Sequence, residues 1–193
     1  MAQFEDPVHN VPGYHRLTMR VIKTKTTYLQ MFSPPEVAEA EPSAPRPDLN
    51  VARVSQPSVE FYRRLYQAVG SDFHWVDRLV MADEELRGII QDDQVDVFVL
   101  TVDKKPAGYS ELDRRETGEI ELAYFGLTPE VTGQGLGKYL LDSTLRAAWS
   151  YQPRRIWVHT CDLDHPAALP NYLRAGFQIY DQVTIDQWVP SEP

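Results

Sequence analysis

The fold of this chain is decided by the stretch Leu127-Thr128-Pro129-Glu130-Val131-Thr132-Gly133-Gln134-Gly135-Leu136-Gly137-Lys138. A strand-like segment precedes it, and a helix-like segment over residues 136–150 follows it. Three glycines at alternate positions let the backbone turn tightly and come close to a ligand. The free N–H groups at the start of the helix would face the loop, where they and the helix dipole favour negative charge. The stretch therefore predicts a cradle for a pyrophosphate group.

The spacing of these glycines separates the loop from two other phosphate loops. It is G-x-G-x-G, and not the G-x-G-x-x-G of dinucleotide folds or the G-x-x-x-x-G-K-[ST] of nucleoside triphosphatases. A Rossmann domain also places its glycine turn after the first strand, whereas several strands precede this one. Taken alone, the loop also admits a plain structural turn, so the sequence downstream has to decide.

Two downstream segments complete the pattern. Residues 155–160 are typical of a buried strand, and the next helix stops at Gly176, a usual residue for a left-handed helix end. The signature A-x-x-x-Y-x-x-x-G-F is matched by Ala168, Tyr172, Gly176 and Phe177. Over roughly residues 50–183 the array resembles the GNAT superfamily of acyl-CoA-dependent N-acetyltransferases. The resemblance implies a mixed α+β fold of three layers, α/β/α, whose β-sheet splays between residues 119–127 and the strand at Ile156. An extra N-terminal strand would add to that sheet, and the splay would admit the pantetheine arm of acetyl-CoA.

The resemblance also implies a set of coenzyme-binding residues. The family's loop is [Q/R]-x-x-G-x-[G/A], and Gly135 and Gly137 fit it, while Thr132 stands where Gln or Arg is usual. His165 stands where the family often has Asn. Acetyl-CoA is the expected acyl donor, and no metal is expected. The predicted coenzyme-binding residues are Phe125, Leu127, Val131, Thr132, Gly133, Gln134, Gly135, Leu136, Gly137, Lys138, His165 and Asn171.

Acetyl transfer to an amine needs a base, because most amines are protonated at neutral pH. We expect the odd positions of strand 119–127 to share one face, namely Glu119, Glu121, Ala123, Phe125 and Leu127. Glu121 lies where some GNAT members carry a catalytic glutamate, so the resemblance implies that it is the general base. It is alternatively a solvated carboxylate or an ion-pair partner of Arg114 or Arg115. Glu119 is its nearest rival, and a water chain is a further route for the proton.

Tyr172 matches the family tyrosine that is held to donate a proton to the departing CoA sulfur. The alternative is a core aromatic residue whose hydroxyl finds a partner. The backbone N–H near Leu127 is the expected oxyanion donor. The His/Asp cluster at 159–165 is a weaker candidate for a metal site than for a helix cap by Asp164.

The sequence contains fewer signals for the acceptor site than for the coenzyme site. Residues 72–78 link two early helices, and this region often forms a wall of the acceptor pocket in GNAT proteins. Trp75 would stack on a cation, and Asp72 or Asp77 would pair with an ammonium group. His159 is a further candidate for acceptor binding. The alternative is a set of surface carboxylates around a Trp that packs in the core.

Length and composition indicate a globular chain. It has 193 residues, of which 42% are apolar and four are Trp. We expect a single domain over 1–193, with an N-terminal strand extension (1–32), a proline-rich loop (33–48) and the acyl-CoA-binding core (49–193). No apolar run approaches the roughly 18 residues that cross a membrane, and no secretory signal is visible. Cys161 is the only cysteine, which fits a reducing cytoplasm.

Hydrophobic periodicity places the remaining elements. Residues 17–31 read as a strand or hairpin arm, which would pair with a partner chain as easily as with its own sheet. Lys104 to Gly108 read as a turn into a strand at 109–114. Further strands are expected at 50–54 and 95–102, and helices at 58–70 and 83–91.

Net charge separates the candidate functions. The formal charge of −9 argues against nucleic-acid binding, which needs a basic face, and suits a cationic small substrate. The leading hypothesis is direct transfer of an acetyl group from acetyl-CoA to a primary amine of a small molecule. The alternatives are a protein or peptide N-acetyltransferase and a non-catalytic acyl-CoA-binding module. A homodimer is possible.

Overall fold

A computed structural model describes residues 19–35 and 44–190. The predicted start of the first strand at residues 17–18 and the middle of the proline-rich loop lie outside these ranges. None of the helices in the described part of the chain is both long and apolar enough to cross a bilayer.

One seven-stranded mixed sheet organises the fold, in the order β2-β3-β4-β5-β6-β1-β7. Neighbouring strands are antiparallel except for β5 and β6, which are parallel. The strands are β1 Met19–Met31, β2 Leu49–Val54, β3 Val95–Val102, β4 Lys105–Asp113, β5 Glu119–Leu127, β6 Arg155–Cys161 and β7 Gln178–Pro190.

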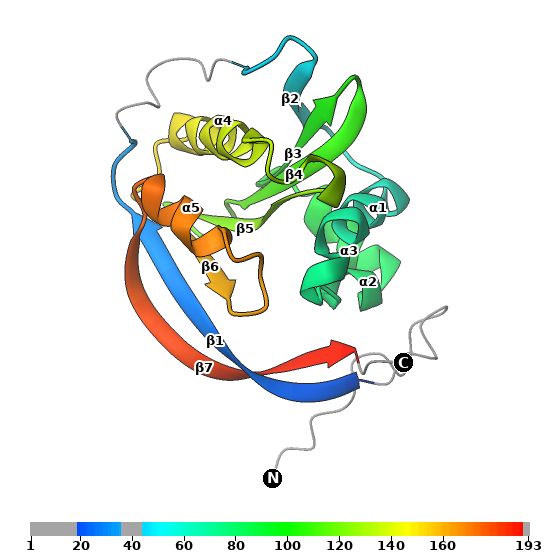
Figure 1. Cartoon of the computed structure of the whole chain (residues 1–193), viewed down its shortest axis with the longest axis vertical. Coiled ribbons are helices and arrows are strands. Elements are labelled where there is room, and N and C mark those ends of the chain that lie inside the picture. The colour runs from blue at the N-terminus through cyan, green and yellow to red at the C-terminus, as the bar shows by residue number, and fades with distance from the viewer. Residues whose placement is uncertain (1–18, 36–43, 191–193) are drawn as a thin grey trace.

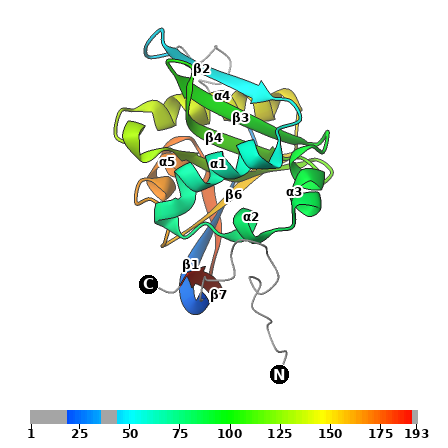
Figure 2. The same ribbon diagram turned by 90° about the vertical axis from the view of Figure 1, so that its right-hand side faces the viewer.

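Helices cover both faces of this sheet, which confirms the predicted three-layer α+β fold (Figure 1). The helices α1 to α3 lie on one face, onto which Figure 2 looks, and α4 and α5 lie on the other. The helices are α1 Val59–Gly70, α2 Asp77–Val80, α3 Asp83–Ile90, α4 Leu136–Ser150 and α5 Ala168–Arg174, with 3₁₀ turns η2 Ser71–Phe73 and η3 Pro129–Val131.

Local sequence explains where the principal helices begin and end. The Ser58 side chain accepts a hydrogen bond from the Phe61 N–H (3.2 Å) and so caps α1. Apolar residues at helical spacing then bury one side of α1 against β3 and β4. After α5, Gly176 adopts φ +100°, which lets the chain turn back into β7.

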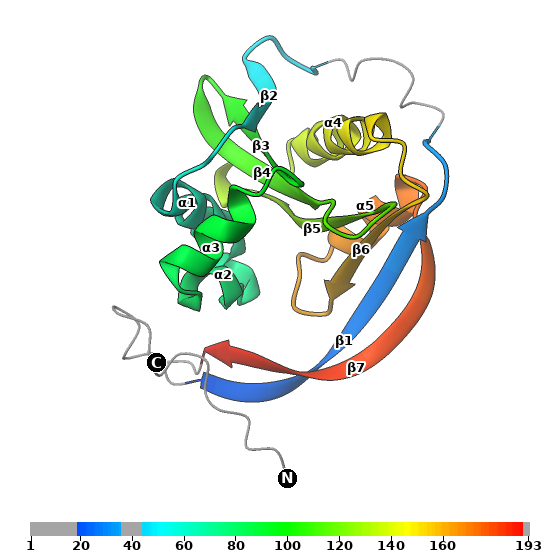
Figure 3. The same ribbon diagram turned by 180° about the vertical axis from the view of Figure 1, so that it is seen from behind.

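The first strand is an interior strand of the sheet. β1 pairs with β6 over Thr26–Met31 and with β7 over Met19–Gln30, so the predicted strand joins the sheet of its own chain. Over residues 19–25 only β7 pairs with it, and pairing of the other edge with a partner chain stays a prediction. Beyond the end of β6, β1 and β7 continue as a two-stranded ribbon. The ribbon curves toward the side of the molecule that carries α2 (Figures 1 and 3).

A β-bulge at Ala123 overturns the prediction that the odd positions of β5 share one face. Glu111 pairs with Tyr124 but Leu112 pairs with Leu122, so Ala123 has no partner on β4. The extra residue reverses the alternation beyond it. Glu119 and Glu121 therefore face the α1–α3 side, while Phe125 and Leu127 pack with Leu122 or Leu136 on the α4 side.

Two further boundaries differ from the prediction. β4 begins at Lys105, because Asp103 and Lys104 alone make the turn, with φ of 48° and 64°. Such a two-residue hairpin turn needs positive φ at both positions, and Pro106 and Gly108, which suggested a longer turn, lie within the strand. The short helix α2, Asp77–Val80, was not predicted, since four residues carry too little periodicity to be seen.

Candidate functional site

The site lies where β5 and β6 separate. The two strands pair only over Glu119–Glu121 and Arg155–Trp157, and then diverge. A cavity of about 1100 Å³ opens at this point. Its lining runs from the glycine loop, past the separated strand ends, to α2 and the β1–β7 ribbon.

The glycine loop has the backbone that its sequence predicts. Gly133 and Gly135 adopt φ of 82° and 77°, and a Cβ at either position would meet nothing within 4 Å. Gly135 precedes α4, and no side chain caps that helix end. The first N–H groups of α4 are therefore left for an anion beside a backbone with free space.

Polar side chains of the loop are bonded within the loop or to its neighbours. The Thr132 hydroxyl donates to the Thr128 carbonyl (3.1 Å), and Gln134 Nε2 donates to the Glu130 carbonyl (3.0 Å). Lys138 Nζ lies 2.5 Å from Asp142 Oδ2, one turn further along α4. Phosphate binding here would consequently depend on the backbone more than on these side chains.

The backbone of Leu127 faces the opening. The next N–H, that of Thr128, donates to the Ala107 carbonyl on the β4 side (2.9 Å). Successive N–H groups of a strand point to opposite sides, so the Leu127 N–H points away from β4 and into the gap beside β5. It is placed to donate to a carbonyl oxygen lying in that gap.

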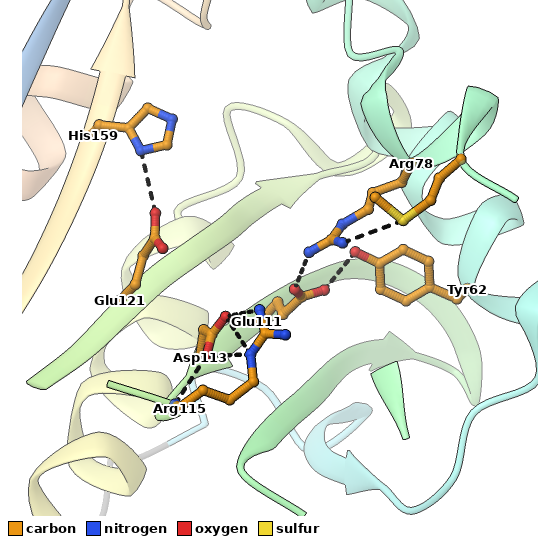
Figure 4. Close-up of polar contacts among 8 residues, drawn as sticks. Tyr62, Arg78, Glu111, Asp113, Arg115, Glu121 and His159 are labelled. Atoms are coloured by element: carbon orange, nitrogen blue, oxygen red, sulfur yellow. Dashed lines mark hydrogen bonds and ion pairs between the residues drawn. The ribbon is translucent and has the colours of Figure 1, made fainter. Parts of the chain in front are cut away.

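Glu121 lies at the point where the strands part, and it faces His159 (Figure 4). Its Oε1 atom lies 3.4 Å from His159 Nδ1. The alternative pairing with Arg114 or Arg115 is wrong, because those side chains bond to Asp96 and Asp113 respectively.

Glu119, the other candidate for the general base, is bonded to Arg155. Glu119 Oε2 accepts hydrogen bonds from Arg155 Nε and Nη2, at 3.1 and 2.5 Å. Glu119 does not line the cavity, whereas Glu121 does.

His159 projects from β6 into the cavity, where its side chain is half exposed. The hydrogen bond to Glu121 raises the pKa of His159 above its ordinary value, and burial opposes this shift. Glu121, Asp164 and Asp77 all add to the rise through their negative charge. The predicted site residues Glu121, His159 and Asp77 are thus brought together.

Tyr172 lines the same cavity from α5 but is buried. Its ring packs edge to face on Phe125 and Phe177, at centroid distances of 6.0 and 5.8 Å. Burial raises the pKa of Tyr172, and the negative charge of Asp164 adds to the rise. The hydroxyl is therefore held in its protonated form at neutral pH.

The other predicted coenzyme residues lie around the same opening. His165 and Asn171 line the cavity. His165 Nδ1 accepts from the Ala167 N–H (3.0 Å), and Asn171 Oδ1 accepts from Arg174 Nη2 (2.5 Å). Val131, Gln134 and Leu136 are absent from the lining, and Leu136 is buried under the loop.

Trp75 is held in an aromatic cluster at the end of the cavity near α2. Its ring lies 5.4 Å from Tyr66 and 5.3 Å from Tyr124, centroid to centroid. Its Nε1 donates to Asp164 Oδ1 (3.3 Å). The oxygen Oδ2 of Asp164 accepts from Thr160 and from the Cys161 N–H, so Asp164 does not cap α5.

A buried ion pair beneath this end was not predicted (Figure 4). Arg78 Nη2 donates to Glu111 Oε1 (2.8 Å), and the Tyr62 hydroxyl donates to Glu111 Oε2 (2.5 Å). Burial raises the pKa of Glu111, against the opposing effects of Arg78 and Tyr62. The pair links α2 to β4. The signal for it was the lone carboxylate in the otherwise uncharged run of residues 106–112.

The β1–β7 ribbon also reaches the site, and no pattern in the sequence predicts this. Thr26 of β1 and residues 185–188 of β7 line the cavity together with His159. The first and last described strands thereby form one wall of the cavity. The described residues contain no group of three His, Cys, Asp or Glu side chains placed to hold a metal ion.

The chain resembles known proteins in sequence pattern and in fold. The model of the acetyltransferase (GNAT) family matches residues 62–177, more than half of the chain. No curated protein sequence matches it. A GCN5-related N-acetyltransferase from Sphaerobacter thermophilus is similar in structure, with a TM-score of 0.64 and 13% identity over 91% of this chain and 54% of that chain. A functionally unknown conserved protein from Staphylococcus epidermidis has a TM-score of 0.59 and 18% identity, over 90% of this chain and 64% of that one.

An aminoglycoside acetyltransferase from an uncultured soil metagenomic sample has a TM-score of 0.56 and 16% identity, over 67% of this chain and 88% of its own. The chain thus spans less than two thirds of the first two structures. At these identities the structural likeness establishes the fold, and the family model establishes the family. The chain belongs to the GNAT family of acetyltransferases.

Proposed function

We propose that this protein transfers an acetyl group from acetyl-CoA to a primary amine of a small molecule. The proposal rests on one observation. A single continuous cavity joins the glycine loop, the gap between β5 and β6, and the Glu121–His159 pair. A donor held by the loop would reach an acceptor beside that pair without leaving the cavity.

The residues around the gap suit acetyl-CoA. Free space over Gly133 and Gly135 and the uncapped start of α4 suit a pyrophosphate. The Leu127 N–H would donate to the thioester carbonyl oxygen. His165 and Asn171 also line the cavity. When bound, acetyl-CoA supplies the activated acetyl group and a thiolate leaving group.

The residues of the chain then handle two protons. An ammonium acceptor first gives one proton to Glu121, directly or through His159 or water. The neutral nitrogen then forms a C–N bond to the acetyl carbon while the C–S bond breaks, and it loses its second proton to water as the amide forms. Tyr172 would give its hydroxyl proton to the departing sulfur. The charge balance is closed when the phenolate regains a proton from solvent and Glu121 releases one.

The walls around the cavity favour a small-molecule acceptor over a peptide acceptor. The acceptor end is walled by α2 on one side and by residues 185–188 of the ribbon on another. A peptide would need an open groove in place of these walls. An aminoglycoside acetyltransferase shares the fold, which is consistent with a small-molecule acceptor. Location in the cytoplasm and a homodimeric state stay predictions.

Calorimetric titration with acetyl-CoA, followed by a panel of amines with detection of released thiol, tests the proposal. We expect saturable binding of acetyl-CoA, no binding of NAD, and turnover that Glu121→Gln reduces without weakening acetyl-CoA binding. Tight acetyl-CoA binding with no turnover of any small or peptide amine would favour the non-catalytic module instead.

A further inference from the structure

Six carboxylates line the cavity, and all but one have partners among the described residues. The exception is Asp77, at the start of α2. The partnered carboxylates and their partners are Asp113 with Arg115, Glu121 with His159, Asp142 with Lys138, Asp186 with Lys23, and Asp164 with Thr160, Cys161 and Trp75.

The cation next to Asp77 in the chain forms no ion pair with it. Arg78 follows Asp77, but its guanidinium turns inward and bonds to buried Glu111. Asp77 is exposed and lines the cavity; desolvation raises its pKa, against the opposing charges of Arg78 and His159. A cavity-lining carboxylate that forms no ion pair is a binding position for a cation.

The position of Asp77 relative to the reaction centre is set by the fold. Asp77 stands on α2, while Glu121 and His159 stand on β5 and β6, and all three line one cavity. Tyr66, Trp75 and Tyr124 line the same cavity, and their rings pack against one another as an aromatic wall. An acceptor whose reacting amine meets Glu121 would therefore lay an apolar stem against rings and extend toward Asp77.

We infer that the acceptor is dicationic: an amine that carries a second ammonium group, which Asp77 binds while the first amine lies beside Glu121 and His159. This inference rests on the proposed function and names the substrate class of the same site. Asp77 would be a specificity-determining residue, since it would contact the substrate away from the bond that forms.

Matched acceptors separate this inference from simple amine binding. Linear α,ω-diamines, n-alkylamines of equal length and amino alcohols of equal length would be compared for kcat/KM. Binding of each to the protein saturated with coenzyme A would be measured by calorimetry. The variants are Asp77→Asn and, as a control, Asp72→Asn, an exposed carboxylate nearby that does not line the cavity. Thermal unfolding would check that both variants fold.

We expect diamines to bind and react better than the other two series. Asp77→Asn should lower diamine affinity and kcat/KM by roughly ten- to a hundredfold, the range of a hydrogen bond to a charged group. The monoamine values should change by less than about twofold, and Asp72→Asn should change none.

Equal affinities for diamines and monoamines would overturn the inference. An Asp77→Asn variant with wild-type affinity and kcat/KM for both series would overturn it as well. Diamine binding that depends on Asp77 with no acetylation of any amine would instead refute the proposed transferase and retain the dication site. Absence of any amine binding in the presence of coenzyme A refutes the inference outright.

Discussion

The ion pair between Arg78 and Glu111 should be the most sensitive polar contact in the acceptor half of the molecule. Glu111 is 0% exposed and Arg78 is 8% exposed. Removing one member leaves the other as an uncompensated buried charge, which costs about 3–5 kcal/mol. A domain of this size has only about 5–15 kcal/mol of total stability. We therefore expect Arg78→Met to lower Tm by roughly 6–20 °C, at about 2–4 °C per kcal/mol.

A double-mutant cycle isolates the pair from packing changes. Glu111→Gln removes the carboxylate charge and keeps an acceptor for the Tyr62 hydroxyl. The double variant Glu111→Gln with Arg78→Met should regain most of the loss, because no unpaired charge remains. Arg115→Met is the matched control, since its partner Asp113 forms an exposed pair worth at most about 1 kcal/mol.

Calorimetric unfolding and acetyl-CoA titration provide the assay. Since the pair anchors α2 and the glycine loop lies on another element, Arg78→Met should raise the KM for amines and leave the Kd for acetyl-CoA unchanged at temperatures where the variant is folded. The reasoning is refuted if Arg78→Met lowers Tm no more than Arg115→Met does, or if the effects of the two single substitutions simply add in the double variant.

Three further predictions concern the cavity. Because Glu121 raises the pKa of His159 above its ordinary 6.5, that pair's stabilisation should be present below pH 6.5 and fade as pH rises through the raised pKa. Turnover should increase over that same range, and Glu121→Gln should lower the NMR titration midpoint of His159. Tyr172→Phe should reduce kcat by about 10²-fold or more with unchanged Tm; an unchanged kcat would exclude its proton from the reaction. Gly135→Ala should weaken acetyl-CoA binding and cost about 1–2 kcal/mol of stability, whereas Gly88→Ala, on open α3 surface, should slightly stabilise the protein; equal Kd values in both would remove the loop from coenzyme binding.

Most of the fold could be predicted from sequence patterns that act over a few residues. The Ser58 cap, the Gly176 stop and the glycine loop act over a few residues, and the structure has each where the sequence predicts it. The splay between β5 and β6 was expected only through the family resemblance, and the register of those strands agrees with it.

Features that depend on tertiary partners were missed. The Ala123 bulge depends on the register between β4 and β5, and the sequence of one strand alone does not contain that information. The place of β1 depends on β6 and β7, which are distant in sequence. The Glu111–Arg78 pair joins β4 to a helix too short to be predicted.

Because β1 lies between β6 and β7, the sheet is completed only late in synthesis on the ribosome. β1 emerges before the other strands of the sheet, yet Thr26 pairs with Cys161 and Thr24 with Ile185, which emerge much later. Pairing between such distant segments is slow and leaves a strand exposed meanwhile. The exposed charges of Lys23 and Lys25 disfavour pairing of that waiting strand with other chains. β6 becomes an interior strand only when β1 has paired with it, and the cavity gains its wall of β7 residues only when β7 has paired with β1.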